Sequence, residues 1–298
     1  MQVRYCSADC QKNHWPKHKK DCKIRAAELR DEALFKDPPA QEDCSICFLP
    51  MPFNLLSCIS LPPATISSVP ICDYAEAKEL ADMDLDIQAV DIYYPCCGKS
   101  VCKGCVHSFA QSGNLGKCPY CNSDRRNKRG EVLVEEIKNR VEANDAASIS
   151  MLAGCYNHGE LGLQQDHARA IELYARAAEL GNNTARLNLG NHHRRGGDLK
   201  KAKFHYEAAA MAGHVGARYN LGITEANSGN MDRAVKHWTI AASAGDYTAM
   251  QTLRTSFEKG HVSRESIDST LTAYNNSCAE MRSEARDAYI RFEMGRII

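Results

Sequence analysis

The chain has 298 residues, of which 44% are hydrophobic and 25% charged, and its 37 Lys and Arg residues balance its 37 Asp and Glu residues. This length suggests about two domains, and a neutral chain has no global attraction for nucleic acid or for anionic lipid. No apolar stretch approaches the roughly 20 residues that a membrane-spanning helix needs, and the first residues lack the apolar core of a signal peptide. We therefore expect an intracellular protein, in cytoplasm or nucleus, whose partners are neither membranes nor nucleic acids.

Cysteine is frequent and is concentrated in the first part of the chain. Of the 15 cysteines, only Cys155 and Cys278 lie beyond residue 121. Disulfides are rare in reducing compartments, and pairs with Cys-x2-Cys spacing are typical of zinc sites. The cysteine pattern therefore predicts structural metal sites and not a disulfide framework.

Residues 1–23 form a short segment with four possible zinc ligands: Cys6, Cys10, His18 and Cys22. With its His-Trp-x2-His-Lys core, the segment resembles the second half of a MYND-type finger. The resemblance implies two zinc sites, each half-built because the cysteines of the first half are absent from this sequence. Two interpretations stay open: a remnant of a finger, or one zinc ion bound by these four side chains.

Residues 24–43 are predicted to be a helix followed by a linker. Ala, Leu, Glu and Arg dominate residues 24–36 and favour a helix, and the two prolines that follow, Pro38 and Pro39, end it.

Residues 44–122 contain ten cysteines, and eight of them form four close pairs; the other two, Cys58 and Cys72, lie in the segment between the first two pairs. The pairs are Cys44 with Cys47, Cys96 with Cys97, Cys102 with Cys105, and Cys118 with Cys121. Eight thiolates suit two tetrahedral zinc sites. The order resembles a RING-type finger, a small module of mixed α/β structure. The resemblance implies that the first and third pairs bind one Zn²⁺ and the second and fourth pairs bind another.

Several positions depart from the RING pattern. Lys99 stands where that family has a histidine ligand, Cys96 is adjacent to Cys97, and His107 is an alternative ligand for the second zinc. Residues 48–95 form a long inserted loop, which is rich in Pro and Ser at first and acidic later.

The RING resemblance also implies a partner. Ile46 and Pro119 match the apolar positions through which such fingers contact a ubiquitin-conjugating enzyme, whereas Asn122 replaces the arginine that often follows the last cysteine. Zinc held by four thiolates has no open position for water. The chain is therefore expected to have no catalytic residues of its own.

Residues 123–145 are predicted to be a basic linker and an amphipathic helix, because Leu133, Val134, Ile137 and Val141 share one face.

A period of 32 residues runs through residues 146–246. It is marked by columns of small and aromatic residues, such as Gly181, Gly213 and Gly245, or Tyr174, Tyr206 and Trp238. Such a period predicts stacked helical hairpins. The columns resemble the Sel-one-like repeat, a relative of the tetratricopeptide repeat, which implies an all-α solenoid of three units that binds proteins or peptides. Residues 247–298 are predicted to be a degenerate repeat and a C-terminal cap.

Two classes of function follow from this organisation. In the first, the protein is a RING-type ubiquitin ligase whose repeats recruit the substrate. In the second, it is an adaptor whose zinc fingers have a structural role alone.

Overall fold

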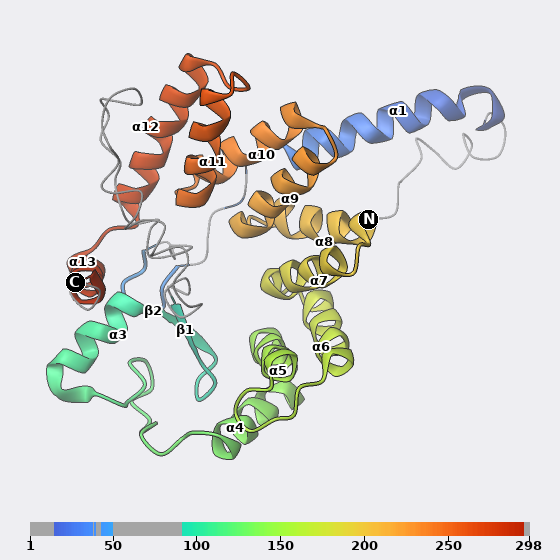
Figure 1. Cartoon of the computed structure of the whole chain (residues 1–298). Helices are drawn as coiled ribbons and strands as arrows, with labels where there is room; N and C mark the ends of the chain where they lie inside the picture. Colours follow the sequence, from blue (N-terminus) through green and yellow to red (C-terminus); the bar gives the residue numbers. More distant parts are fainter. Residues whose placement is uncertain (1–14, 38, 40–42, 50–90, 295–298) are drawn as a thin grey trace.

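The computed structural model describes residues 15–37, 39, 43–49 and 91–294, and Figure 1 shows their arrangement. A curved array of helices runs from α4 (Glu131–Glu142) to α12 (Arg264–Glu280), and a small module of two strands and a helix lies beside it. Helix α1 (Trp15–Leu34) extends away from the array. No helix among the described residues is long and apolar enough to cross a membrane.

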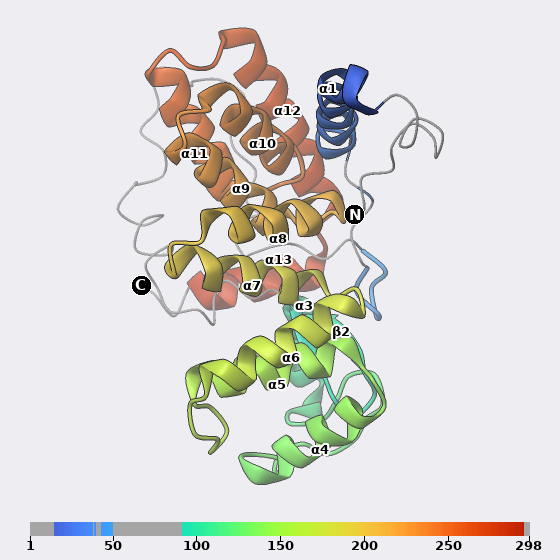
Figure 2. The same cartoon turned by 90° about the vertical axis from the view of Figure 1, so that its right-hand side faces the viewer.

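The array consists of helical hairpins. Their helices are α5 (Ala146–His158), α6 (His167–Glu179), α7 (Asn183–Arg195), α8 (Leu199–Met211), α9 (Val215–Asn227), α10 (Met231–Ser243) and α11 (Tyr247–Glu258). Each helix packs against the next one along the chain, and Figure 2 shows them stacked in order. The prediction of a helical solenoid is therefore confirmed.

Side-chain caps and glycines set the ends of these helices. The residue before α5, α6, α7, α8, α9 or α11 accepts a hydrogen bond from a backbone N–H of the first turn, which satisfies a donor that the helix leaves free. After α6, α8 and α10, the glycines of one column have φ between 90° and 92°. That backbone conformation is unfavourable for residues with a Cβ, so the glycine column fixes the turn between repeats.

A second glycine column allows the two helices of a hairpin to approach closely. A Cβ atom at Gly190 would lie 2.4 Å from the Tyr206 ring, and one at Gly222 would lie 2.4 Å from the indole nitrogen of Trp238. Each ring thus occupies the space that a side chain would need. The glycine and the aromatic residue are sixteen positions apart in both units, so this contact is repeated with the period of the sequence.

The small module is built on a β-hairpin. Strand β1 (Asp91–Tyr94) pairs antiparallel with β2 (Lys99–Cys102). Helix α3 (Lys103–Phe109) follows directly and continues into a wide turn, η3 (Ala110–Asn114). The module contacts the start of the array, where the Tyr93 hydroxyl lies 2.8 Å from that of Ser148 and Arg140 donates to the Pro95 carbonyl over 2.9 Å.

The far end of the array returns to the same module. Helices α11 and α12 extend the stack beyond the third repeat, but α13 (Glu284–Met294) leaves it and packs against α3. Of the residues predicted to form a degenerate repeat and a C-terminal cap, 247–298, those of α11 and α12 extend the array, whereas those of α13 pack against the small module. Both ends of the array meet that module, which closes the curve seen in Figure 1.

Helix α1 corrects a boundary. The helix predicted for residues 24–36 begins nine residues earlier, at Trp15. Pro16 lies in its first turn, where a proline removes no helical hydrogen bond, and no further proline interrupts it before Pro38. Among its described side chains, those of the last turns contact the array, with Leu34 buried against α8 and α9.

Candidate metal centre

The first cysteine pair lies in a tight turn. Cys44 and Cys47 are held by backbone hydrogen bonds from Phe48 to the Cys44 carbonyl (3.0 Å) and from Cys44 to the Leu49 carbonyl (3.0 Å). Phe48 has a left-handed backbone, with φ of 54°. This geometry turns both sulfurs to the same side of the loop.

The last cysteine pair repeats that turn. Asn122 donates to the Cys118 carbonyl over 2.8 Å and has φ of 59°. Asparagine tolerates a left-handed backbone better than most residues. Its presence at the position where an arginine is usual in RING fingers therefore suits the local backbone.

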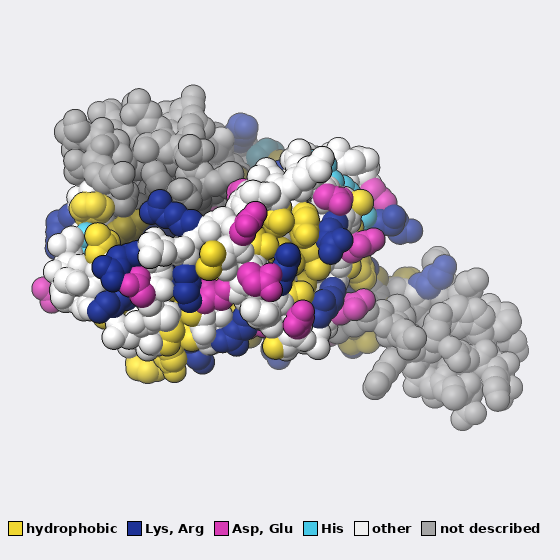
Figure 3. All heavy atoms as spheres, turned by 90° about the horizontal axis from the view of Figure 1, so that it is seen from below, with side chains coloured by type: hydrophobic (Ala, Val, Ile, Leu, Met, Phe, Trp, Pro, Cys, Tyr) yellow, Lys and Arg dark blue, Asp and Glu magenta, His cyan; other side chains and the backbone are white. Residues whose placement is uncertain are grey.

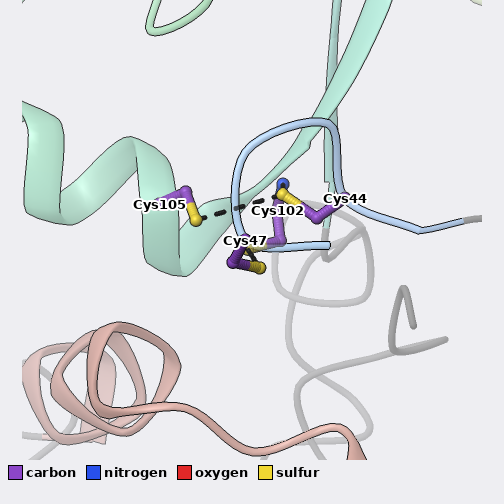
Figure 4. Close-up of side chains that lie close together, drawn as sticks. All are labelled: Cys44, Cys47, Cys102 and Cys105. Atoms are coloured by element: carbon purple, nitrogen blue, oxygen red, sulfur yellow. Dashed lines mark hydrogen bonds between the residues drawn. The ribbon is translucent and has the colours of Figure 1, made fainter. Parts of the chain in front are cut away.

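Four cysteines from three elements form the first group, which Figure 4 shows. Cys44 and Cys47 come from the turn, Cys102 from the end of β2 and Cys105 from the first turns of α3, and their sulfurs lie within 4.8 Å of one another. The Sγ atoms of Cys44 and Cys105 are 3.9 Å apart, as are those of Cys47 and Cys102. A tetrahedral zinc with Zn–S bonds of about 2.3 Å separates its sulfurs by about 3.8 Å, so the spacing fits that ion.

The remaining four cysteines form a second group. Cys96 and Cys97 lie at the tip of the β-hairpin and meet Cys118 and Cys121, again within 4.8 Å. The sulfurs of Cys97 and Cys118 are 3.8 Å apart, and those of Cys96 and Cys121 are 3.5 Å apart. The hairpin tip thus directs two adjacent cysteines into one group.

His107, the alternative ligand, lies elsewhere. Its ring packs against the rings of Tyr289 and Phe292 on α13, with centroid separations of 5.8 and 4.9 Å. Lys99 is exposed, with its ammonium 5.6 Å from the centre of the Tyr120 ring. The second group therefore consists of cysteines alone.

Thiols packed this closely cannot all ionise without a cation between them. Burial, followed by the hydrogen bond and the charge of Cys118, raises the pKa of Cys97 to about 12. Burial is also the main cause that raises the pKa of Cys47 and of Cys96. A hydrogen bond with Ser123 instead lowers the pKa of Cys121 to about 6. Binding of a divalent cation removes this conflict, because zinc takes the thiolate form and releases the protons.

An arginine from the end of the chain completes the first group. Arg286 of α13 is buried, and its guanidinium donates to the sulfur of Cys102 at 3.4 Å and to that of Cys47 at 3.6 Å. It also donates to the carbonyls of Leu49 and Met281. Hydrogen bonds to coordinating sulfurs orient metal ligands and tune their basicity.

The sequence analysis did not find Arg286, because nothing in its neighbourhood repeats or matches a motif. The sequence holds one indirect sign of this contact, which is Gly104, between Cys102 and Cys105 of the third pair. A Cβ at Gly104 would lie 2.7 Å from the backbone of Arg286, so α13 can pack against α3 only where that side chain is missing.

The other predicted site residues are placed as follows. Ile46 is 37% exposed at the turn between the first two cysteines, and Pro119 is half-buried in the last turn. Cys6 and Cys10 lie outside the described residues. His18 and Cys22 lie in α1, but their side chains are likewise outside the described part.

Comparison with known families identifies two parts of the chain. Residues 1–22 match the MYND finger, and residues 146–182, 184–214 and 215–246 each match the Sel1 repeat. These matches confirm the MYND-type segment and the three repeats that the sequence analysis predicted. A comparison with curated proteins found no match.

Two solved structures are similar to the array. One is a Sel1 repeat protein from Oxalobacter formigenes, with 20% identity over 63% of this chain and 74% of that chain, and a TM-score of 0.46. The other is a protective antigen of uropathogenic Escherichia coli strains that displays an SLR fold, with 21% identity, 63% of this chain covered and a TM-score of 0.42. This chain covers only 43% of the E. coli protein.

These findings define a class of protein. A MYND-type segment and two groups of four cysteines indicate that the protein binds zinc, and Sel1 repeats generally mediate contacts between proteins. The chain therefore combines a MYND-type segment, two groups of four cysteines and three Sel1 repeats, an organisation that is typical of a protein-interaction module.

Proposed function

We propose that residues 44–122 form a RING-type finger with two zinc ions and act as a ubiquitin-ligase module, while the repeats of residues 146–246 recruit the substrate. The observation that supports this most is the interleaving of the cysteine pairs. The first pair groups with the third and the second with the fourth, which is the pairing that the RING resemblance implies.

The zinc ions in this proposal have a structural role. All eight donors are thiols, four to a group, and a closed tetrahedral shell leaves no position at which water could be activated. Residues Cys6, Cys10, His18 and Cys22 would bind a third zinc ion within the MYND-type segment. Metal analysis of the purified chain counts the ions directly: three are expected with the N-terminal site, and two without it.

The partner surface in this proposal lies on the two turns that hold cysteine pairs. Ile46 is apolar yet 37% exposed, and it makes no contribution to the sulfur groups. A conjugating enzyme would bury it together with Pro119. Figure 3 shows Lys and Arg side chains interspersed with Asp and Glu side chains on the face seen from below.

A second candidate function is supported by the position of α13. Because α13 covers part of α3 and its rings contact His107, the finger already serves as a docking element within the molecule. In this alternative the protein is an adaptor, and its finger joins the two ends of the repeat array without transferring ubiquitin.

Ubiquitin transfer separates the two functions. The full chain would be incubated with ubiquitin, its activating enzyme and a panel of conjugating enzymes, and ubiquitin chains would be detected on gels. A ligase forms them, and Ile46→Ala should reduce them sharply with zinc content unchanged, because an interface residue of this kind contributes about 2 kcal/mol. Val132→Ala, which alters an exposed apolar side chain on α4, is the matched control. A zinc-loaded chain that is inactive with every conjugating enzyme decides for the adaptor.

A further inference from the structure

The last turns of α1 contact three helices of the array, α8, α9 and α10, and the surface that these helices present to α1 is here called the α1 groove. Leu34 is 1% exposed and packs in a cluster with Tyr206, Ala210 and Leu221. By contrast, Ile24 and Leu29 earlier in the helix are both 49% exposed, and Figure 1 shows α1 extending away from the array. Among the described side chains of α1, the contact is thus concentrated in residues 30–35, here called the anchor.

Charged side chains of the α1 groove form ion pairs and a hydrogen bond with this anchor. Arg30 pairs with Glu207 of α8, and Asp31 pairs with Arg233 of α10. The guanidinium of Arg218 donates to the Leu34 carbonyl over 2.8 Å, which satisfies one of the carbonyls that the end of a helix leaves free. The groove therefore selects a basic residue, an acidic residue and a helix end at defined positions.

An aromatic contact extends the same recognition by one residue. The Phe35 ring stacks on the His237 ring with their centroids 4.7 Å apart. The charged groups of Arg233 and Lys236 lie 5.2 and 5.5 Å from the centre of the Phe35 ring, within the range of a cation–π contact. Leu34 and Phe35 are together the apolar part of the anchor.

The acidic residues of the groove interrupt the repeat pattern. Glu207 stands in the column of Ala175 and Thr239, and Glu225 stands in the column of His193 and Phe257. The neighbouring hairpins stack without a carboxylate at either position, so stacking does not require one. A buried carboxylate lowers stability unless it is paired, and these two side chains are only 5% and 1% exposed.

The partners of the two carboxylates explain why they are there. Glu207 pairs directly with Arg30 of the anchor. Glu225 accepts hydrogen bonds or ion pairs from Lys203 at 2.6 Å and from the Arg233 Nε at 3.2 Å, and so holds the guanidinium that binds Asp31. Glu207 thus acts on α1 directly. Glu225, which also accepts from the Asn230 amide at 3.0 Å, links α8 to α10 and acts on α1 through Arg233.

We propose that the α1 groove is a binding site for short helical segments of partner proteins with the pattern Arg-Asp-x-x-Leu-Phe, and that residues 30–35 of the chain itself occupy it. The contact has the features of helix-in-groove recognition: one short helix, apolar anchors on one face and flanking charges. A partner segment of the same chemistry displaces α1 and with it the N-terminal MYND-type segment. This inference specifies the protein-binding role proposed for the repeats.

A labelled peptide of residues 24–39 tests the proposal by fluorescence anisotropy. It should bind the full chain carrying Leu34→Ala and Phe35→Ala at least about tenfold more tightly than it binds the wild type, because a tethered anchor competes at high effective concentration. Adding Glu207→Gln to that variant should weaken binding about tenfold, whereas adding Glu179→Gln, at an exposed position of α6, should not. Arg30→Glu, at a side chain that is 58% exposed, releases the anchor without removing apolar packing and should also increase binding.

Peptide variants sharpen the test. A peptide with Leu34→Ala and Phe35→Ala should lose binding, and one with Leu29→Ala should bind as the original does. Equal binding to wild type and to both released variants would overturn the proposal, as would binding that ignores Glu207→Gln. A wild-type dimer that dissociates in the Leu34→Ala, Phe35→Ala variant would also overturn it, since α1 would then occupy a second copy. None of these measurements depends on ubiquitin transfer, so the proposed ligase activity and the proposed peptide-binding site can be refuted independently.

Discussion

The zinc-finger module and the helical array are stabilised in different ways. In the module, the buried cluster consists largely of cysteines, with Tyr94 and Val101 as its main apolar side chains. In the array, alanines, glycines and one aromatic ring per hairpin pack with the period of the sequence. A small module with so few apolar residues depends on its metal, whereas stacked repeats are stabilised by contacts between neighbours.

Removal of zinc should have the largest effect of these changes, and it should unfold the module but not the array. Structural zinc contributes on the order of 10 kcal/mol per site, so a chelator should unfold residues 44–121 and leave the array folded. Circular dichroism at 222 nm should keep most of its helical signal, while limited proteolysis should begin within the module and at the junction before α13. Loss of the whole helical signal on chelation would show that the array depends on the module.

Overpacking should damage the array alone. Ala209 of α8 is fully buried, so Ala209→Leu should separate two helices and lower the free energy of unfolding by about 1–3 kcal/mol. Lys200→Leu, at an exposed position of the same helix, is the control and should change little. Urea denaturation measures both, and equal losses at the two positions would contradict the register of the repeats.

Protonation of a buried histidine, His237, should make the array less stable in acid. Burial, and then the charge of Arg218, lower the pKa of His237 from 6.5 to about 3, and neither of its ring nitrogens has a hydrogen-bond partner among the described residues. Its folded pKa lies below its unfolded pKa, so its contribution is present above pH 6.5 and is lost as the pH falls towards 3. Between pH 7 and pH 5 this amounts to about 2 kcal/mol.

The variant His237→Phe isolates that contribution. Its free energy of unfolding, measured in urea at pH 7 and at pH 5, should differ between the two pH values by about 2 kcal/mol less than that of the wild type. The phenyl ring keeps the stacking on Phe35 and has no group to protonate. An unchanged pH dependence would mean that His237 does not protonate when the array unfolds.

The smallest effect is expected at Arg286, whose side chain connects α13 to the first cysteine group. Arg286→Met removes the hydrogen bonds to the sulfurs of Cys102 and Cys47 and should weaken zinc binding at the first group about tenfold, or about 1.4 kcal/mol. The second group should keep its affinity. Competition with a chromophoric chelator measures both sites, and Arg282→Met, which breaks an ion pair with Asp287 away from the sulfurs, should change neither.

The sequence by itself determined the features that depend on local chemistry or on repetition. A period of 32 residues defines its own register, so the hairpins could be predicted from columns such as Gly181, Gly213 and Gly245. The contact of Gly190 with the Tyr206 ring came from the structure. The pairs of cysteines could be recognised because a tetrahedral ion needs thiols at close spacing. The sequence alone did not decide whether Cys96 or His107 belongs to the second group. That needed the structure, in which the hairpin tip places Cys96 in the group and His107 packs against α13.

The tertiary structure decided the contacts between residues far apart in the chain. Arg286 meets Cys102 across 184 positions and Arg30 meets Glu207 across 177, and no motif joins either pair. Such contacts depend on the curvature of the whole array, which places α13 against the module, and on the packing of α8, α9 and α10, which places Glu207, Arg218 and Arg233 around the end of α1. Curvature is the sum of many small rotations between neighbouring helices, and no single segment of the sequence encodes it.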